Sequence, residues 1–112
     1  MTTVKKLWGV EQWVVNEPEY CFKVLTLQPG FACSLHYHKV KKETFIVQSG
    51  CCDLQISDGK TRMVLGDQAT IGPGIYHRFS LGSWETEPCV IYEVSTFHSD
   101  DDVVRLEESK RL

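Results

Sequence analysis

Two histidines and a glutamate lie close together in the segment HYHKVKKE, at a spacing that suits one metal ion. His36 and His38 are two residues apart, so on an extended strand both imidazoles leave the same face. Glu43 opens the next apolar run, ETFIVQ, and a short connection over residues 39–42 would bring its carboxylate beside the imidazoles. The segment therefore predicts a metal centre with two histidine ligands and one carboxylate.

A fourth candidate ligand, His77, lies in the segment GDQATIGPGIYHRF, where a Gly-Pro-Gly turn precedes a strand that begins close to the histidine. Imidazole nitrogens and a carboxylate oxygen, with water at open positions, suit zinc, manganese, iron or nickel. A lone histidine is more often a packed or surface residue. Here three of the four histidines and a glutamate have strand-compatible spacings around two glycine turns. We therefore expect one divalent ion, whose identity the residues leave open.

Short β-strands must position these side chains. They are expected over residues 11–15, 20–28 and 43–49 and over several later segments that are rich in aromatic or β-branched residues. Asp58-Gly59 is the strongest hairpin signal in the sequence. About nine strands at such turn spacings are typical of an all-β, antiparallel sandwich or barrel.

The strand in YCFKVLTLQ has two mixed faces. Alternation puts Lys23 on one face together with two leucines, and Phe22 on the other face with Val24. Neither face is purely polar, so the pattern does not indicate which one lies inside.

The end of the chain, HSDDDVVRLEESKRL, differs from the rest because it is acidic first and basic last. This polarity suits a helix dipole, with Ser99 as a candidate N-cap, and predicts a short C-terminal helix or an ordered tail. Asp100, Asp101 and Asp102 are interpreted as a solvated charge run rather than a second metal site, because consecutive carboxylates diverge on any regular backbone.

Length and composition indicate one compact domain over residues 1–112, with 42% hydrophobic and 24% charged residues. A net charge of −3 without a basic stripe argues against nucleic acid as a partner. The longest apolar runs are a few residues, and MTTVKKLWGV lacks the apolar stretch of a signal peptide. We expect no membrane partner and a cytoplasmic location. The five cysteines are an odd number without CxxC pairs, so buried free thiols are expected.

These residues carry a resemblance to the cupin superfamily. The first cupin motif, G-x5-H-x-H-x4-E-x6-G, is matched by Gly30, His36, His38, Glu43 and Gly50. Most of the second motif, G-x5-P-x-G-x2-H-x3-N, is matched by Gly66, Gly74 and His77, while Gly72 and Leu81 replace its Pro and Asn. The resemblance implies a small antiparallel double-sheet jelly-roll β-barrel, with the metal held in its mouth by His36, His38, Glu43 and His77.

A closer resemblance is to the cupin domain of type II mannose-6-phosphate isomerases, and it extends over nearly the whole chain. The matching pieces include Trp8-Gly9, FKV, LQPG, Ser49-Gly50, His77-Arg78 and DDVVRLE. One departure is that the family usually has Gln at the position of His36, so this metal shell is richer in imidazole. The resemblance implies aldose–ketose isomerisation of a sugar or sugar phosphate.

Isomerisation needs a Lewis acid, which the metal would supply, and a base that moves a proton between neighbouring carbons. Glu93 or Lys23 is the candidate base if its strand face points inward. Arg78 or Lys23 is the candidate for holding a phosphate or carboxylate. The alternative for Arg78 is a rim salt bridge, and for Glu93 an outward position.

Two other functions remain open from the sequence: an iron-dependent dioxygenase, and a non-catalytic sugar-binding or structural cupin. In each case the expected partner is a small polar, sugar-like molecule. Since cupins commonly pair through strand or sheet contacts, we also expect a homodimer, with Trp8 and Trp13 covering the contact.

Overall fold

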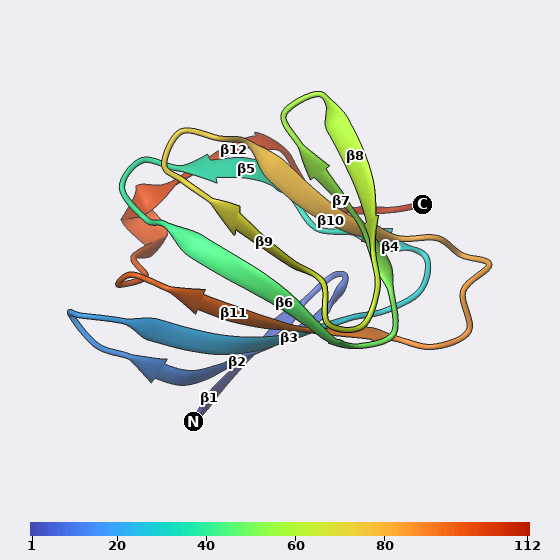
Figure 1. The fold of residues 1–112 in the computed structure, drawn as a ribbon, viewed down its shortest axis with the longest axis horizontal. Helices are drawn as coiled ribbons and strands as arrows, with labels where there is room; N and C mark the ends of the chain where they lie inside the picture. Colours follow the sequence, from blue (N-terminus) through green and yellow to red (C-terminus); the bar gives the residue numbers. More distant parts are fainter.

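The computed structural model describes residues 1–112, and its strands form two antiparallel β-sheets (Figure 1). The first sheet has six strands in the order β1 (Thr2–Lys6), β2 (Gly9–Asn16), β3 (Cys21–Leu27), β11 (Cys89–Ser95), β6 (Glu43–Ser49) and β9 (Gln68–Ile71). The second sheet has the order β12 (Val103–Glu107), β5 (Leu35–His38), β10 (His77–Leu81), β4 (Phe31–Ala32) and β13 (Lys110–Arg111). The hairpin of β7 (Cys52–Ile56) and β8 (Gly59–Met63) joins this sheet through β10.

The space between the sheets holds the apolar core, because inward positions alternate along each strand with outward ones. On β3 and β6 the buried residues are every second one. Burying each large apolar side chain contributes about 1.5–3 kcal/mol. The fully buried members include Leu27, Val47 and Ile91 from the first sheet and Leu54 and Leu81 from the second. The predicted all-β, antiparallel double-sheet architecture is confirmed.

All nine of the predicted strands are present, and the hairpin that Asp58-Gly59 indicated joins β7 to β8. The structure adds β1, β4, β12 and β13. Four of the five cysteines are buried, Cys51 is half-buried, and all five thiols are free.

The predicted C-terminal helix is a single 3-10 turn, η1 (Asp100–Asp102), with the Ser99 side chain accepting a hydrogen bond from the backbone N–H of Asp101. The residues after it form β12, which pairs with β5. The two valines that open β12 favour an extended backbone, and the free edge of β5 provides the partner. No helix in the structure has the length and apolar character needed to cross a membrane.

Gly9 turns the chain between β1 and β2 and brings Trp8 inward. Its φ is +149°, and a Cβ at this position would lie 1.8 Å from the backbone oxygen of Thr26. Only glycine fits so close an approach. As a result the Trp8 side chain is buried, at 6% exposure.

Candidate metal centre and pocket

Three histidines converge from two neighbouring strands of the second sheet. His36 on β5 and His77 on β10 are direct partners in the antiparallel ladder, so their side chains share the inward face. His38 lies two residues further along β5 on the same side. One ring nitrogen from each histidine lies within 4.8 Å of the others.

Glu43 reaches the histidines from the other sheet, as the first residue of β6. Its Oε2 lies 3.0 Å from Nε2 of His77 and 3.5 Å from Nε2 of His38. The connection over residues 39–42 crosses from β5 to β6, and it is this crossing that places the carboxylate beside the imidazoles.

Hydrogen bonds at the outer nitrogens orient two of the rings. Nδ1 of His36 lies 2.9 Å from Oγ and 3.0 Å from the backbone oxygen of Ser34, and Nδ1 of His77 lies 3.1 Å from the backbone oxygen of Ile75. A carbonyl only accepts, so Nδ1 of His77 carries the proton and its Nε2 presents a lone pair. That lone pair faces the Glu43 carboxylate.

The cluster contains buried polar atoms without a hydrogen-bond partner: Nδ1 of His38, Oε2 of Glu43 and Nε2 of His77. Glu43 and His77 are only 2% and 1% exposed. Two buried acceptors that face each other at 3.0 Å repel unless a cation lies between or beside them. The residues therefore fit a divalent metal ion.

The protonation states of the cluster also suit a metal. Burial lowers the pKa of His36 to about 3, with a further contribution from His77, and burial lowers the pKa of His38 to about 4. Burial alone raises the pKa of Glu43, but the close contact with His77 and the charge of Lys41 outweigh it and lower the pKa to about 2. At neutral pH the imidazoles of His36 and His38 are therefore neutral and the Glu43 carboxylate is ionised, which are the forms that bind metals.

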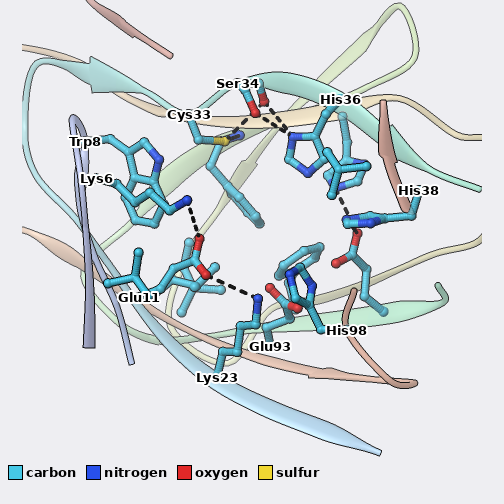
Figure 2. Close-up of a pocket in the computed structure, with 18 of the residues that line it drawn as sticks. Lys6, Trp8, Glu11, Lys23, Cys33, Ser34, His36, His38, Glu93 and His98 are labelled. Atoms are coloured by element: carbon cyan, nitrogen blue, oxygen red, sulfur yellow. Dashed lines mark hydrogen bonds and ion pairs between the residues drawn. The ribbon is translucent and has the colours of Figure 1, made fainter. Parts of the chain in front are cut away.

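A cavity of about 230 Å³ opens in front of the histidines and is lined by side chains from both sheets. Figure 2 shows His36 and His38 on one side of it and Trp8, Lys6 and Glu11 on the other. The cavity therefore has a wall of histidines that faces an aromatic and charged wall.

Lys23 lies inside the barrel, only 2% exposed, on the inward face of β3. Its Nζ lies 3.2 Å from Oε1 of Glu11 and 4.3 Å from the centre of the Trp13 ring. Although burial raises the pKa of Glu11, the charge of Lys23 and the hydrogen bond from Trp13 lower it overall. Glu11 is therefore an ionised partner that holds the lysine against the pocket wall.

Glu93 also points inward from β11 and is 5% exposed. Nζ of Lys41 lies 2.5 Å from its Oε2 and 3.5 Å from Oε1 of Glu43. Burial raises the pKa of Glu93 against the opposing effect of Lys41. Burial lowers the pKa of Lys41, but the charges of Glu93 and Glu43 outweigh it and raise the pKa overall. Lys41 is therefore the ammonium that balances two buried carboxylates.

Three residues near the centre were not expected from the sequence. The sequence pattern places Lys41 in a connection and Asp102 in a solvated charge run, and it gives His98 no role. His98 lies 8% exposed, with Nδ1 3.0 Å from Nζ of Lys41 and its ring against Trp13. No local signal distinguished Lys41 from the neighbouring lysines, because it lies in the connection and outside any strand.

The structure does not bring Arg78 to this cavity, and its expected ligand-holding role does not fit the geometry. On β10 His77 and Phe79 line the cavity, so Arg78 between them projects from the opposite face. There its guanidinium donates to Glu107 at 2.9 Å and to the backbone oxygen of Cys33 at 3.0 Å. It ties β10 to the C-terminal segment.

The expectation that Trp8 and Trp13 cover a subunit contact is wrong. Both side chains line the cavity, and Trp13 is held there by its hydrogen bond to Glu11, at 2.9 Å, and by Lys23 over its ring. The register of β2 against β3 turns Trp13 toward Lys23.

A family model described as "Cupin domain" matches residues 23–95. Among curated proteins, a mannose-1-phosphate guanylyltransferase of Sinorhizobium fredii is 24% identical over 109 residues, which cover 97% of this chain and 21% of that protein. Mannose-1-phosphate guanylyltransferase 2 of Escherichia coli O157:H7 is 28% identical over 103 residues, which cover 90% of this chain and 21% of that protein. The chain thus spans about a fifth of the length of these relatives.

Solved structures share the fold at low sequence identity. Oxalate decarboxylase of Bacillus subtilis aligns with a TM-score of 0.80 at 18% identity, covering 94% of this chain and 30% of that one. L-ribose isomerase of Cellulomonas parahominis with L-ribose aligns with a TM-score of 0.74 at 18% identity, covering 80% of this chain and 60% of that one. KdgF from Halomonas sp. aligns with a TM-score of 0.69 at 19% identity, covering 82% of this chain and 81% of that one.

Proposed function

The chain belongs to the family of cupin domains, and from this premise we propose that it is a metal-dependent enzyme that interconverts an aldose and a ketose. The observation that carries the proposal is the placement of three histidines and Glu43 on one wall of a small cavity into which buried acid and base groups also point. The metal part and the proton-transfer part of the proposal rest on different residues and are tested separately.

His36, His38, Glu43 and His77 would hold one divalent ion, which when bound supplies a Lewis acid for the adjacent oxygens of a sugar. The support for this assignment is the set of unpartnered buried atoms and the neutral imidazoles beside an ionised carboxylate. The metal remains one of zinc, manganese, iron or nickel, because this donor set suits all four.

Glu93 is the proposed base. Its carboxylate accepts the C–H proton from the carbon next to the carbonyl and delivers it to the former carbonyl carbon, while the hydroxyl proton moves to the former carbonyl oxygen. Burial raises the pKa of Glu93, which makes the carboxylate a stronger base than an exposed one. Lys41 fixes the orientation of that carboxylate through its contact at 2.5 Å.

The proposed substrate is a monosaccharide or its phosphate. The cavity of about 230 Å³ is smaller than the roughly 300–1,000 Å³ typical of drug-sized ligands. Trp8 and Trp13 offer flat apolar faces, and the pair of Lys23 and Glu11 offers a donor and an acceptor for hydroxyl groups. The names of the two guanylyltransferase relatives and of L-ribose isomerase, which refer to sugars, support the same class.

The test is a screen of metal-loaded protein against aldoses, ketoses and their phosphates in heavy water, with deuterium uptake beside the carbonyl as the readout. We expect uptake with the unmodified protein and loss of uptake in Glu93→Gln. The matched control is Glu87→Gln, an exposed glutamate outside the pocket, which should retain uptake.

Two results would replace the isomerase proposal. No uptake together with substrate-dependent oxygen consumption by the iron-loaded protein would assign an oxygenase. Saturable sugar binding without uptake or oxygen consumption would assign a non-catalytic sugar-binding protein. Uptake that is unchanged in Glu93→Gln would remove Glu93 from the role of base.

We also propose a homodimer, formed through the outward face of the first sheet, and we keep the cytoplasmic location as a prediction. Outward positions on the central strands of this sheet are uncharged: Phe22 and Val24 on β3, Ile46 on β6, and Tyr92 and Val94 on β11. The rings of Phe22 and Tyr92 stack edge to face with centres 5.3 Å apart, and Val94 is 45% exposed. An uncharged apolar sheet face of this kind favours association with a second copy.

A further inference from the structure

Asp102, the last residue of η1, ties the C-terminal segment to the connection between β5 and β6. Its Oδ1 accepts the backbone N–H of Val40 at 2.8 Å, and its Oδ2 accepts the backbone N–H of Lys41 at 3.0 Å. Its own backbone oxygen accepts from Lys39 at 3.0 Å. The carboxylate is therefore held in place from two sides, with a side chain only 11% exposed.

The same carboxylate faces a histidine of the cluster. Oδ2 of Asp102 lies 3.5 Å from Nδ1 of His38, and that nitrogen has no other partner although the ring is 4% exposed. The opposite nitrogen, Nε2, lies 3.5 Å from Oε2 of Glu43. His38 thus lies between one carboxylate that comes from the C-terminal segment and another that belongs to the cluster.

An ionised carboxylate only accepts hydrogen bonds, so it favours the imidazole tautomer with the proton on the nitrogen that faces it. Asp102 therefore favours protonation of His38 on Nδ1, with the lone pair on Nε2, whereas Glu43, at the same 3.5 Å from Nε2, favours the opposite tautomer. Asp102 is the carboxylate whose two oxygens are both fixed by backbone N–H groups, and a cation bound to Glu43 would remove the competition. The opposite tautomer would direct an N–H into the cluster and remove one metal-binding lone pair. A carboxylate in this position also restricts rotation of the ring.

We propose that Asp102 is a positioning residue that fixes His38 as the Nδ1-protonated tautomer with Nε2 directed into the metal cluster. The inference rests on the metal-binding part of the proposed function and adds a residue that the cluster itself does not contain. The pairing of β12 with β5 brings this carboxylate to the outer side of a candidate ligand.

The neighbouring aspartate provides a matched control. Asp101 is exposed, belongs to the same turn, and has no side-chain hydrogen bond; only its backbone N–H is used, by Ser99. Asp101→Asn therefore removes one negative charge from the same turn without touching His38. Asp102→Asn keeps the size of the side chain but replaces one acceptor oxygen by an N–H donor.

The first test reads the tautomer directly and needs no metal. The 15N chemical shifts of the imidazole nitrogens in the metal-free protein should show His38 protonated on Nδ1, and protonated on Nε2 in Asp102→Asn. Asp101→Asn should match the unmodified chain. A His38 protonated on Nε2 in the unmodified chain would overturn the inference. If Asp102→Asn does not fold, the 15N shifts of the unmodified chain are sufficient to test the inference.

The second test is a double-mutant cycle on zinc affinity, measured by competition with a chelator, because it separates an effect through His38 from a general effect on the connection. Asp102→Asn should weaken zinc binding about 10- to 100-fold. In the His38→Gln background the same change should cost less than about 3-fold, since the ligand it positions is gone. An equal loss in both backgrounds, or no loss in either, contradicts the inference.

The two tests keep this inference distinct from the proposed function. If the unmodified chain binds no zinc, manganese, iron or nickel, the proposed metal enzyme fails, and the tautomer measurement still decides the role of Asp102. If the chain binds metal and the Asp102→Asn cycle shows no coupling to His38, only the present inference fails.

Discussion

Nζ of Lys41 lies 2.5 Å from Oε2 of Glu93, and this pair links the connection after β5 to the middle of β11 inside the barrel. Lys41 also contacts Glu43 and His98, and its side chain is 1% exposed. One ammonium group therefore lies against both the candidate metal centre and the proposed base.

Removal of this ammonium is expected to destabilise the metal-free protein. Lys41→Met leaves two buried carboxylates without a cation, so the free energy of unfolding should fall by about 3–5 kcal/mol. Chemical denaturation with circular dichroism measures the change. Adding Glu93→Gln to Lys41→Met should restore part of the loss, and Lys39→Met, at an exposed position in the same connection, should have little effect.

The metal centre itself is tested by removing two of its imidazoles. His36→Ala combined with His77→Ala should abolish stoichiometric metal, because water replaces a neutral nitrogen ligand only weakly. Elemental analysis after dialysis gives the metal content. His98→Gln, which alters a histidine that lines the cavity outside the cluster, should keep it. An unchanged metal content in the double variant would falsify the assignment.

The metal-free protein should lose stability as the pH falls below about 6.5. In the folded state burial lowers the pKa of His36 from 6.5 to about 3, so between these values the unfolded chain binds the proton and the folded protein does not. Stability is therefore fully present above pH 6.5 and decreases toward pH 3. Glu43, whose pKa is lowered from 4.5 to about 2, adds a loss in the same direction at lower pH.

Denaturation midpoints measured from pH 8 to 4 check this dependence. His36→Gln should flatten the curve between pH 6.5 and 4, because the variant has one group fewer that takes up a proton on unfolding. A midpoint that rises on acidification would contradict the neutral state of His36 in the folded protein.

The proposed dimer predicts that a charge on the outward face of the first sheet separates the subunits. Tyr92→Glu places a carboxylate beside Phe22 at the centre of that face, where burial in a dimer would leave it unpaired. Light scattering should give a dimeric mass for the unmodified chain and a monomeric mass for the variant. Thr61→Glu, at an exposed site on β8, should stay dimeric. A monomeric mass for the unmodified chain rules the contact out.

The strands and the histidine cluster were accessible from the sequence because both depend on local periodicity. The two-residue spacing of His36 and His38 fixes their common face on any strand, and the turn at residues 72–74 fixes where the strand of His77 begins. The structure of the C-terminal segment was harder to predict, because its charge polarity suits a helix while pairing with the edge of β5 stabilises a strand.

The sequence by itself determined which side chains share a face of a strand. It did not determine which face points into the barrel. Only the tertiary structure decided that Lys23 and Glu93 point inward and that Arg78 projects away from the cavity. The physical reason is that alternation fixes relative orientation, whereas burial depends on which sheet packs against the strand.

The same reason explains why Lys41 is buried while Lys39 and Lys42 are exposed, and why Asp102 contacts His38 while the two preceding aspartates do not. Nothing in KVKKE or DDD marks one lysine or one aspartate as buried. Each acquires its role from partners distant in the chain: Lys41 from Glu93, and Asp102 from the backbone of Val40 and Lys41 and from His38. Long-range contacts of this kind form only when the two sheets and the C-terminal segment assemble, so tertiary structure alone selects these residues.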